Sequence, residues 1–507
     1  MLTKIKVRNY KGFKEAELPI KPITIMLGAN SSGKSSIIQL LLILQQTAEE
    51  AQDSYKSALK IYGKRISIGK PENLFYTLDK KIPVHFKICF NNDKVYKNLQ
   101  NAIQTYYLGL SSFYFRTKTF KEVFFKDRNL LREVLDNEFQ NSDRLYYLGI
   151  DISDYILEQD IIEKDIESLL RNYDFLMNIR KRINSSEFSF SYNVKYYRKE
   201  LIVSSFSLQQ DNISIISYSE DSGFFSDIIA LTDDDKDFLK SVFSKNTTIF
   251  NLFQKSQNKK IKKTSIGHSI ISIVNSILSE LRSEFVEPNI NHVSPLRAYP
   301  QRYYMLDKAN VSSSLDTYDA NAIAEVIKEK PSLQTKVNDW LDQFCIGVNI
   351  EEFKEAIHKL AINQSGLSLD IPDVGFGISQ VLPVVMQGFL SPNESVTIME
   401  QPEIHLHPQM QGALADLFIN IVKESRFKKH LIIETHSEYM LKRLRRRIAE
   451  EVISNDKVSI NLFHARTEQE SAIIENLPVE KRGAFKWPEE LYNGELYEDV
   501  VKFLKLQ

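Results

Sequence analysis

The sequence has few of the residues that mark secreted, zinc-stapled or membrane-embedded proteins. It contains only two cysteines, Cys89 and Cys345, which excludes a disulfide framework and a four-cysteine zinc site and is typical of a reducing compartment. The longest apolar run, residues 37–44, is far too short to span a bilayer. The N-terminus runs directly into a strand pattern and lacks the features of a signal peptide. We therefore expect a cytoplasmic protein without a membrane partner.

An excess of charge of one sign is also missing. The formal net charge is −1, which excludes a globally basic nucleic-acid binder but leaves local patches open. Five lysines fall within residues 255–263, where we expect a solvated linker rather than a contact with a phosphate backbone. Residues 441–447 form a basic helix face, for which solvent or a protein partner is favoured over DNA.

The strongest pattern present is a short apolar strand, residues 23–27, followed by a glycine-flanked loop. Gly28, Gly33, Lys34 and Ser35 fill the fixed positions of the phosphate-binding pattern G-x-x-x-x-G-K-[ST]. Glycines let backbone N–H groups turn toward phosphate oxygens, and the following helix adds its positive end. The pattern predicts that ATP binds here, with Lys34 on the β- and γ-phosphates and Ser35 on Mg²⁺. The residues expected to contact the nucleotide are Asn30, Ser31, Ser32, Gly33, Lys34, Ser35 and Ser36.

Further motifs near the C-terminus would complete such a site. The apolar strand 395–400 ends in Glu400, a position from which a carboxylate holds Mg²⁺ directly or through water. Gln401 and Glu403 follow, and a second strand, 430–434, is followed by His436. Upstream, the glycine loop 373–380 opens a helix and is a second candidate anion site.

The order of these motifs resembles that of the ABC-type ATPases, in the branch of the SMC, RecF-like and OLD proteins. Residues 295–303, 400–408 and 483–488 are similar to one subgroup, the bacterial AAA15-type ATPases with a DUF3696-like C-terminus. That subgroup occurs in anti-phage defence systems such as Septu and PARIS. The resemblance covers about residues 1–95 and 285–507.

The resemblance implies an α/β fold: a P-loop ABC-type ATPase head with a mixed β-sheet flanked by helices. It further implies a head-to-tail dimer of this chain that sandwiches two ATP molecules. Gly375, Gly377 and their loop would face the γ-phosphate bound to the partner copy, and His436 would be the switch histidine on that phosphate. Arg297 and Arg302 are expected to be structural.

Two departures from the ABC pattern bear on activity. Gly375 stands where the signature loop normally has serine, so Ser379 or backbone N–H groups would have to substitute. Gln401 stands where a glutamate normally orients the attacking water. Glutamine can hold a water but cannot accept its proton, so we expect slow hydrolysis unless Glu403 acts as the base.

Between the two ATPase segments, 1–95 and 285–507, lies a stretch of different texture. Residues 96–284 are rich in Tyr and Phe and carry no motif with a chemical interpretation, so we interpret them as an α+β insertion. Before it, residues 61–69 and 84–90 are predicted as strands, and within it 152–183 as helical and 188–216 as strands with turns.

Three functions remain open at this stage. The first is an ATPase of an anti-phage defence complex that senses infection and controls a separate effector, probably a nuclease. The second is a RecF- or SMC-like ATPase that acts directly on DNA. The third is an ATP-locked scaffold that does not hydrolyse, which Gln401 favours.

Overall fold

The structure is a computed structural model of the 507-residue chain. It describes residues 1–50, 56–93, 96–97, 163–182, 185–254, 264–305, 315–316, 319–354, 357–364 and 366–485. Three sequence predictions lie partly or wholly outside this range: the first part of the expected insertion, the lysine run 255–263, and the motif end at Trp487-Pro488.

The chain divides into two compact units. The first joins Met1–Gln45 to Glu284–Gln507, and the second is Gln46–Ser283. The first unit therefore contains both the glycine-flanked loop and the later motifs, although they lie far apart in the sequence.

The centre of the first unit is a six-stranded sheet in the order β17-β16-β3-β15-β14-β9. The strands are β3 (Ile23–Gly28), β9 (Ile290–Val293), β14 (Ser395–Glu400), β15 (Lys429–Glu434), β16 (Val458–His464) and β17 (Ile473–Leu477). All neighbours pair in parallel except β16 and β17. Every residue of β3 is buried, which is the near-continuous apolar pattern of a parallel strand covered on both faces.

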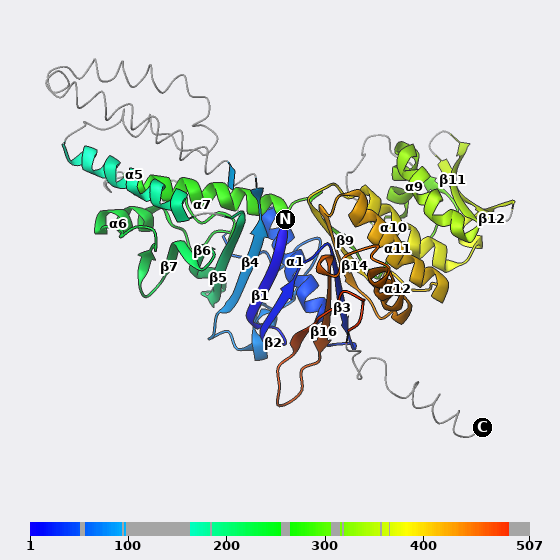
Figure 1. Ribbon diagram of the computed structural model, residues 1–507, viewed down its shortest axis with the longest axis horizontal. Coiled ribbons are helices and arrows are strands. Elements are labelled where there is room, and N and C mark those ends of the chain that lie inside the picture. Colours follow the sequence, from blue (N-terminus) through cyan, green and yellow to red (C-terminus); the bar gives the residue numbers. More distant parts are fainter. Residues whose placement is uncertain are drawn as a thin grey trace, which may run out of the picture. The chain divides into compact units, whose positions relative to one another are not determined.

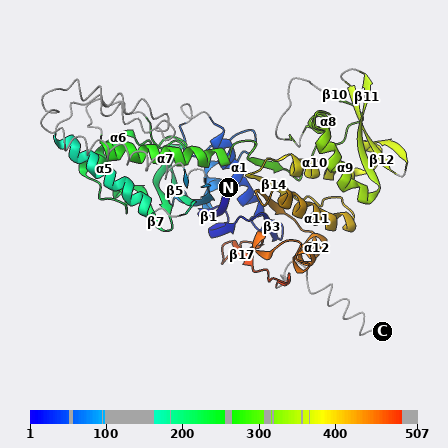
Figure 2. The ribbon, with the colours of Figure 1, turned by 45° about the horizontal axis from the view of Figure 1, so that its top comes forward.

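Helices cover both faces of this sheet. They are α1 (Lys34–Ala48), α10 (Phe376–Leu390), α11 (Pro408–Glu424) and α12 (Glu438–Ala449). In both ribbon views α1 lies on one side of β3 and β14, and the other three lie on the opposite side (Figures 1 and 2). Ser437 caps α12 by accepting a 3.1 Å hydrogen bond from the Met440 N–H, which starts the helix directly after β15.

Smaller elements complete the first unit. A hairpin is formed by β1 (Leu2–Tyr10) and β2 (Phe13–Pro19). A four-stranded antiparallel sheet contains β10 (Tyr304–Met305), β11 (Ile346–Lys354), β12 (Ile357–Gln364) and β13 (Leu367–Asp370). It is accompanied by α8 (Ala320–Glu329), α9 (Pro331–Leu341) and the short 3-10 turns Asp342–Phe344 and Ile371–Asp373, and a third such turn, Asn455–Lys457, precedes β16.

The second unit is built on an antiparallel sheet of consecutive strands. These are β4 (Val84–Asn91), β5 (Glu187–Tyr197), β6 (Glu200–Gln210), β7 (Ile213–Ser219) and β8 (Gly223–Phe225). Its described helices are α5 (Glu163–Arg182), α6 (Asp233–Val242) and α7 (Ser265–Glu284), with 3-10 turns at Pro71–Leu74 and Tyr76–Leu78. Clustered aromatic side chains such as Phe206, Tyr218 and Phe243 fill the core beside β6–β8, which explains the Tyr- and Phe-rich texture.

The α/β architecture is confirmed, as are the strands expected at 84–90 and 395–400. One strand prediction is wrong. Residues 61–69 form no strand: they contain only an isolated bridge between Tyr62 and Ser67, closed by a 2.9 Å bond from the Gly63 N–H to Ile66 O. The alternating pattern here belongs to a tight loop packed on the Gln46 side chain. No helix among the described residues is long and apolar enough to cross a membrane.

Candidate functional site

The glycine-flanked loop between β3 and α1 requires its glycines. At Gly28 a Cβ atom would lie 2.5 Å from the Phe463 carbonyl oxygen, so the loop passes too close to β16 for a side chain. Gly33 has φ 101°, a conformation that favours glycine, and a Cβ there would meet the Phe13 ring at 2.5 Å. The loop is therefore clamped between β16 and the β1–β2 hairpin, and its backbone path is fixed.

Lys34, the first residue of α1, closes this loop. Its ammonium donates to the Gly28 and Ala29 carbonyl oxygens at 2.8 and 2.9 Å and lies 3.7 Å from Glu434 Oε1. The side chain is only 4% exposed, and burial lowers the pKa of Lys34 although the Glu434 charge opposes the shift. The buried cation is thus held at the point where the loop begins.

The other loop residues offer polar groups at different depths. Asn30, Ser31 and Ser35 are exposed, Gly33 and Ser36 are half-buried, and Ser32 is buried. The Ser32 hydroxyl has no hydrogen-bond partner among the described residues. A buried, unpartnered hydroxyl beside a buried ammonium fits a ligand that brings oxygen atoms, as a phosphate does. The Tyr10 hydroxyl of β1 donates a 2.9 Å hydrogen bond to the Ser36 carbonyl oxygen and so links the hairpin to the end of the loop.

Strand register brings the carboxylates to the same edge of the sheet. Glu400 pairs with Glu434, and Glu434 pairs with Met26, so the ends of β14, β15 and β3 are level. Neighbouring strands lie about 4.8 Å apart, which puts the Glu400 backbone about 10 Å from β3. His292, at the end of β9, lies on the far side of Glu400, with its Nε2 2.6 Å from Glu400 Oε1.

Glu434 is a site residue that the sequence analysis missed. It is 5% exposed, and its Oε2 atom has no hydrogen-bond partner among the described residues. Burial raises the pKa of Glu434 to about 7; Lys34 opposes the shift, and Glu400 and Glu403 add to it. The available signal was an acidic residue at the end of an apolar strand two positions before His436, the same signal that singled out Glu400.

Arg297 is buried and binds backbone carbonyl groups, as expected for a structural arginine. Its guanidinium donates to the carbonyl oxygens of Gln380 at 3.1 Å, Glu400 at 2.8 Å and Gln401 at 3.0 Å. Burial lowers its pKa to about 10, against the pull of Glu403 and Glu400. Arg302 differs: it is half-exposed and pairs with Asp370 and Asp373 at 2.8 and 2.9 Å.

Backbone groups of Glu434 and His436, at and just after the end of β15, bind Gln401 and Glu403. Gln401 has φ 44° and its N–H donates to the Glu434 carbonyl oxygen at 2.8 Å. Glu403 is 9% exposed, and its Oε1 accepts a 2.7 Å bond from the His436 N–H. Burial raises the pKa of Glu403, and burial together with the nearby Lys34 charge lowers the pKa of the exposed His436. The loop after β14 and the residue after β15 are therefore connected.

The second glycine loop packs against the loop that follows Glu403. Gly375 has φ 93° at the start of α10, where a Cβ would have open space around it. At Gly377 a Cβ would lie 2.7 Å from the His405 carbonyl oxygen. The Ser379 hydroxyl is buried and donates to the Phe376 carbonyl oxygen at 2.7 Å. No hydrogen bond of the described residues joins 375–379 to the loop 28–36 of the same chain.

The candidate metal ligands, Ser35 and Glu400, do not form a closed metal site. Within the described ranges, no group of three or more His, Cys, Asp or Glu side chains has the arrangement of a metal centre. Mg²⁺ is usually held by one or two protein groups together with substrate phosphates, and Ser35 and Glu400 would supply such protein oxygens.

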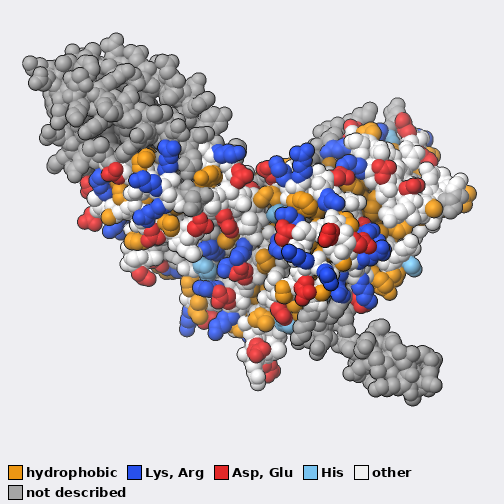
Figure 3. Space-filling view, viewed as in Figure 1, with side chains coloured by type: hydrophobic (Ala, Val, Ile, Leu, Met, Phe, Trp, Pro, Cys, Tyr) orange, Lys and Arg blue, Asp and Glu red, His pale blue; other side chains and the backbone are white. Residues whose placement is uncertain are grey.

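Three arginines of the basic face of α12 pair with two carboxylates of the same unit. Arg443 and Arg447 both pair with Asp416 of α11, at 2.7 and 2.6 Å, and Arg446 pairs with Glu450 at 2.6 Å. Figure 3 shows Lys and Arg side chains interspersed with Asp and Glu over the visible face rather than gathered in one patch.

Replacing Glu434 by glutamine should change how stability depends on pH. The folded carboxyl, with a pKa of about 7, keeps its proton between pH 4.5 and 7, where the unfolded one releases it, so stability falls as pH rises through this window. At about 1.4 kcal/mol per pKa unit, the free energy of unfolding of the wild-type protein should fall by up to about 3 kcal/mol across this window. That of Glu434→Gln should not show this fall. Denaturant unfolding at pH 5, 6.5 and 8 measures this.

The exposed Glu468→Gln is the matched control and should follow the wild-type profile. Equal pH slopes for Glu434→Gln and the wild-type protein would show that Glu434 ionises at its ordinary pH.

A family model described as "AAA ATPase domain" (AAA_15) matches residues 1–441. No curated protein matches the chain. Similar solved structures include an SMC head bound to the C-terminal winged-helix domain of ScpA (11% identity, TM-score 0.41, 95% of this chain and 99% of that one). A second is the SMC head domain from Thermotoga maritima (8% identity, TM-score 0.35, 94% of this chain and 99% of that one). A third is an SMC head with an extended coiled coil from Pyrococcus furiosus (9% identity, TM-score 0.35, 99% of each chain). On the match over residues 1–441, the chain belongs to the AAA_15 family of AAA ATPase domains.

Proposed function

We propose that this AAA_15 ATPase is a slowly hydrolysing ATP switch that works as a dimer and controls a separate effector, a nuclease, in bacterial anti-phage defence. The observation that carries the slow turnover is the environment of the position after Glu400. Gln401 occupies that position with its backbone held by Glu434 and Arg297, and Glu403 is buried and bonded to the His436 N–H. Neither side chain is suited to accept the proton of an attacking water. We therefore expect slow hydrolysis and a long-lived ATP-bound state.

ATP binding itself follows from residues that are already arranged for phosphate. The loop 28–36 offers N–H groups, the buried Lys34 ammonium and the unpartnered Ser32 hydroxyl. Ser35 and Glu400 would hold Mg²⁺ together with the phosphates, and the ion would neutralise charge on them. His436, near the Lys34 charge, would contact the γ-phosphate.

The geometry around α10 supports a composite site between two copies. This helix begins at Gly375 without a side-chain cap, so its first N–H groups have no such partner, and the space around Gly375 is open. Because these N–H groups do not bond the loop 28–36 of their own chain, they suit a phosphate held by a second copy.

The defence role and the effector rest on the motif resemblance described above. The alternative of direct action on DNA is not favoured, because Arg443, Arg446 and Arg447 of α12 lie beside Asp416 and Glu450, whose charges would repel a continuous phosphate backbone. A scaffold that never hydrolyses remains the outcome if turnover is absent.

Gln401→Glu should raise ATP turnover by at least about tenfold, because a carboxylate accepts the proton that an amide cannot. Phosphate release by purified wild-type protein, Gln401→Glu and Glu403→Gln measures this. Brisk wild-type turnover that is unchanged in Gln401→Glu and lost in Glu403→Gln would instead make Glu403 the base and refute the slow switch.

ATP and Mg²⁺ should convert the wild-type protein to a dimer in light-scattering chromatography. Gly375→Asp adds a negative charge at the start of α10 and should abolish the dimer while leaving binding of a fluorescent ATP analogue within about twofold, since the residue lies outside the Lys34 loop. Lys34→Ala should lose the dimer and the analogue molecule bound at the loop 28–36. A Gly375→Asp protein that still dimerises on ATP would rule out this composite site.

A cloned locus that contains this gene and its neighbours should lower phage plating in a bacterial host by at least about tenfold, and Lys34→Ala in the same locus should remove the protection. Protection that survives Lys34→Ala would separate defence from ATP, and no protection against a broad phage panel would count against the defence role. Expression of both proteins is checked by immunoblot.

A further inference from the structure

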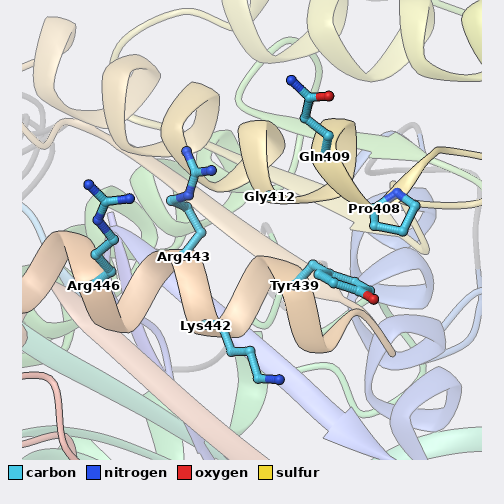
Figure 4. A pocket seen from close by; sticks show the side chains of 7 residues that line it. All are labelled: Pro408, Gln409, Gly412, Tyr439, Lys442, Arg443 and Arg446. Atoms are coloured by element: carbon cyan, nitrogen blue, oxygen red, sulfur yellow. The ribbon is translucent and has the colours of Figure 1, made fainter.

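A surface groove of about 370 Å³ lies between the first half of α11 and α12 (Figure 4). We call it the α11–α12 groove. Pro408 and Gln409, at the start of α11, form one wall, and residues of α12 from Tyr439 to Arg446 form the other. No carboxylate lines it. Its volume falls in the range of small-molecule sites, of roughly 300–1,000 Å³.

The side chains of the α12 wall follow one another along the helix axis. Tyr439, 51% exposed, comes first, Arg443 lies one turn later and Arg446 one turn beyond that. Seven residues at 1.5 Å each separate the ring from the last cation by about 10 Å. Figure 4 shows both arginines projecting toward α11 and the Tyr439 ring below Pro408. An aromatic ring followed by two guanidinium groups suits a ligand with a planar base at one end and phosphates at the other.

The arginines are oriented by carboxylates outside the groove. Arg443 uses Nη1 toward Asp416, and Arg446 uses Nε toward Glu450, so other N–H groups of each guanidinium remain for a ligand. Arg447 pairs with both carboxylates, which leaves three arginines against two acids. Gly412 supplies the room: a Cβ there would lie 3.6 Å from Arg443 Nη2.

The same carboxylates decide which anion fits. A continuous nucleic-acid strand that extended past the groove would meet Asp416 and Glu450 and be repelled. A compact anion stays between the arginines. We propose that the α11–α12 groove is a second nucleotide site, which binds a nucleoside polyphosphate with its base on Tyr439 and its phosphates on Arg443 and Arg446.

The groove is placed to influence the first site. Tyr439 lies in the first turn of α12, which begins at Glu438, two residues after His436. Ser437, the residue between them, also donates a 2.7 Å bond to Gln411 of α11. A ligand that draws α11 and α12 together therefore acts next to His436, and the second site is regulatory.

Titration of a fluorescent ATP analogue tests the proposal. The wild-type chain should bind two molecules, and Lys34→Ala should lose the loop site and keep one. On the Lys34→Ala background, Arg443→Gln and Arg446→Gln should each weaken the remaining site by at least about tenfold, because each loses a charge-assisted contact. Gly412→Met fills the groove without changing any charge and should abolish binding.

Lys423→Gln removes one exposed positive charge from α11 outside the groove and is the matched control, with less than a twofold effect. Arg446 is 63% exposed, so its variant tests binding without disturbing the core. One bound molecule per wild-type chain, or residual binding that the groove variants do not change, would overturn the proposal. So would displacement of the analogue from Lys34→Ala by a ten-nucleotide single strand at lower concentration than by ATP.

Discussion

The buried ammonium of Lys34 is the contact on which the site depends. It neutralises two carbonyl dipoles and faces Glu434, in surroundings where an unpaired charge would be costly. Burial and the nearby Glu400 and Glu403 raise the pKa of Glu434 to about 7, against the pull of Lys34. A divalent cation that arrived with a nucleotide at this edge of the sheet would favour the ionised form of this carboxyl.

Parallel strand order explains how distant segments meet. Residues of β3, β14 and β15 come from positions 23–28, 395–400 and 429–434, yet their carboxyl ends are level because the strands are in register. The chain can therefore carry a whole second unit between Gln45 and Glu284 without separating the loop from its partners. For these strands to contribute to one site, each must carry its functional residue at or just after its carboxyl end.

Local patterns predicted the parts of the site that depend on neighbours in sequence. The glycine loop, the strand that ends in Glu400 and the residue after β15 each carry their own signal within a few residues. The sequence analysis missed Glu434 and His292 and gave Arg297 no contacts. These features depend on which strands lie side by side. The strand prediction for residues 61–69 was wrong for the converse reason: in the described part of the chain this segment pairs only with itself, through the bridge between Tyr62 and Ser67. The roles given to the candidate nucleotide, metal and catalytic residues, Gln401, Glu403 and Gly375 included, remain predictions.

Arg297 has a mechanical consequence. Its guanidinium donates to the carbonyl oxygen of Gln380, near the start of α10, and to those of Glu400 and Gln401 at the end of β14. The helix start that would face a second copy and the strand end that would hold magnesium in this copy are thereby one rigid part. A displacement of α10 by a nucleotide on the opposite chain would be transmitted directly to the loop after Glu400, so that each copy would register the occupancy of the other through a single side chain.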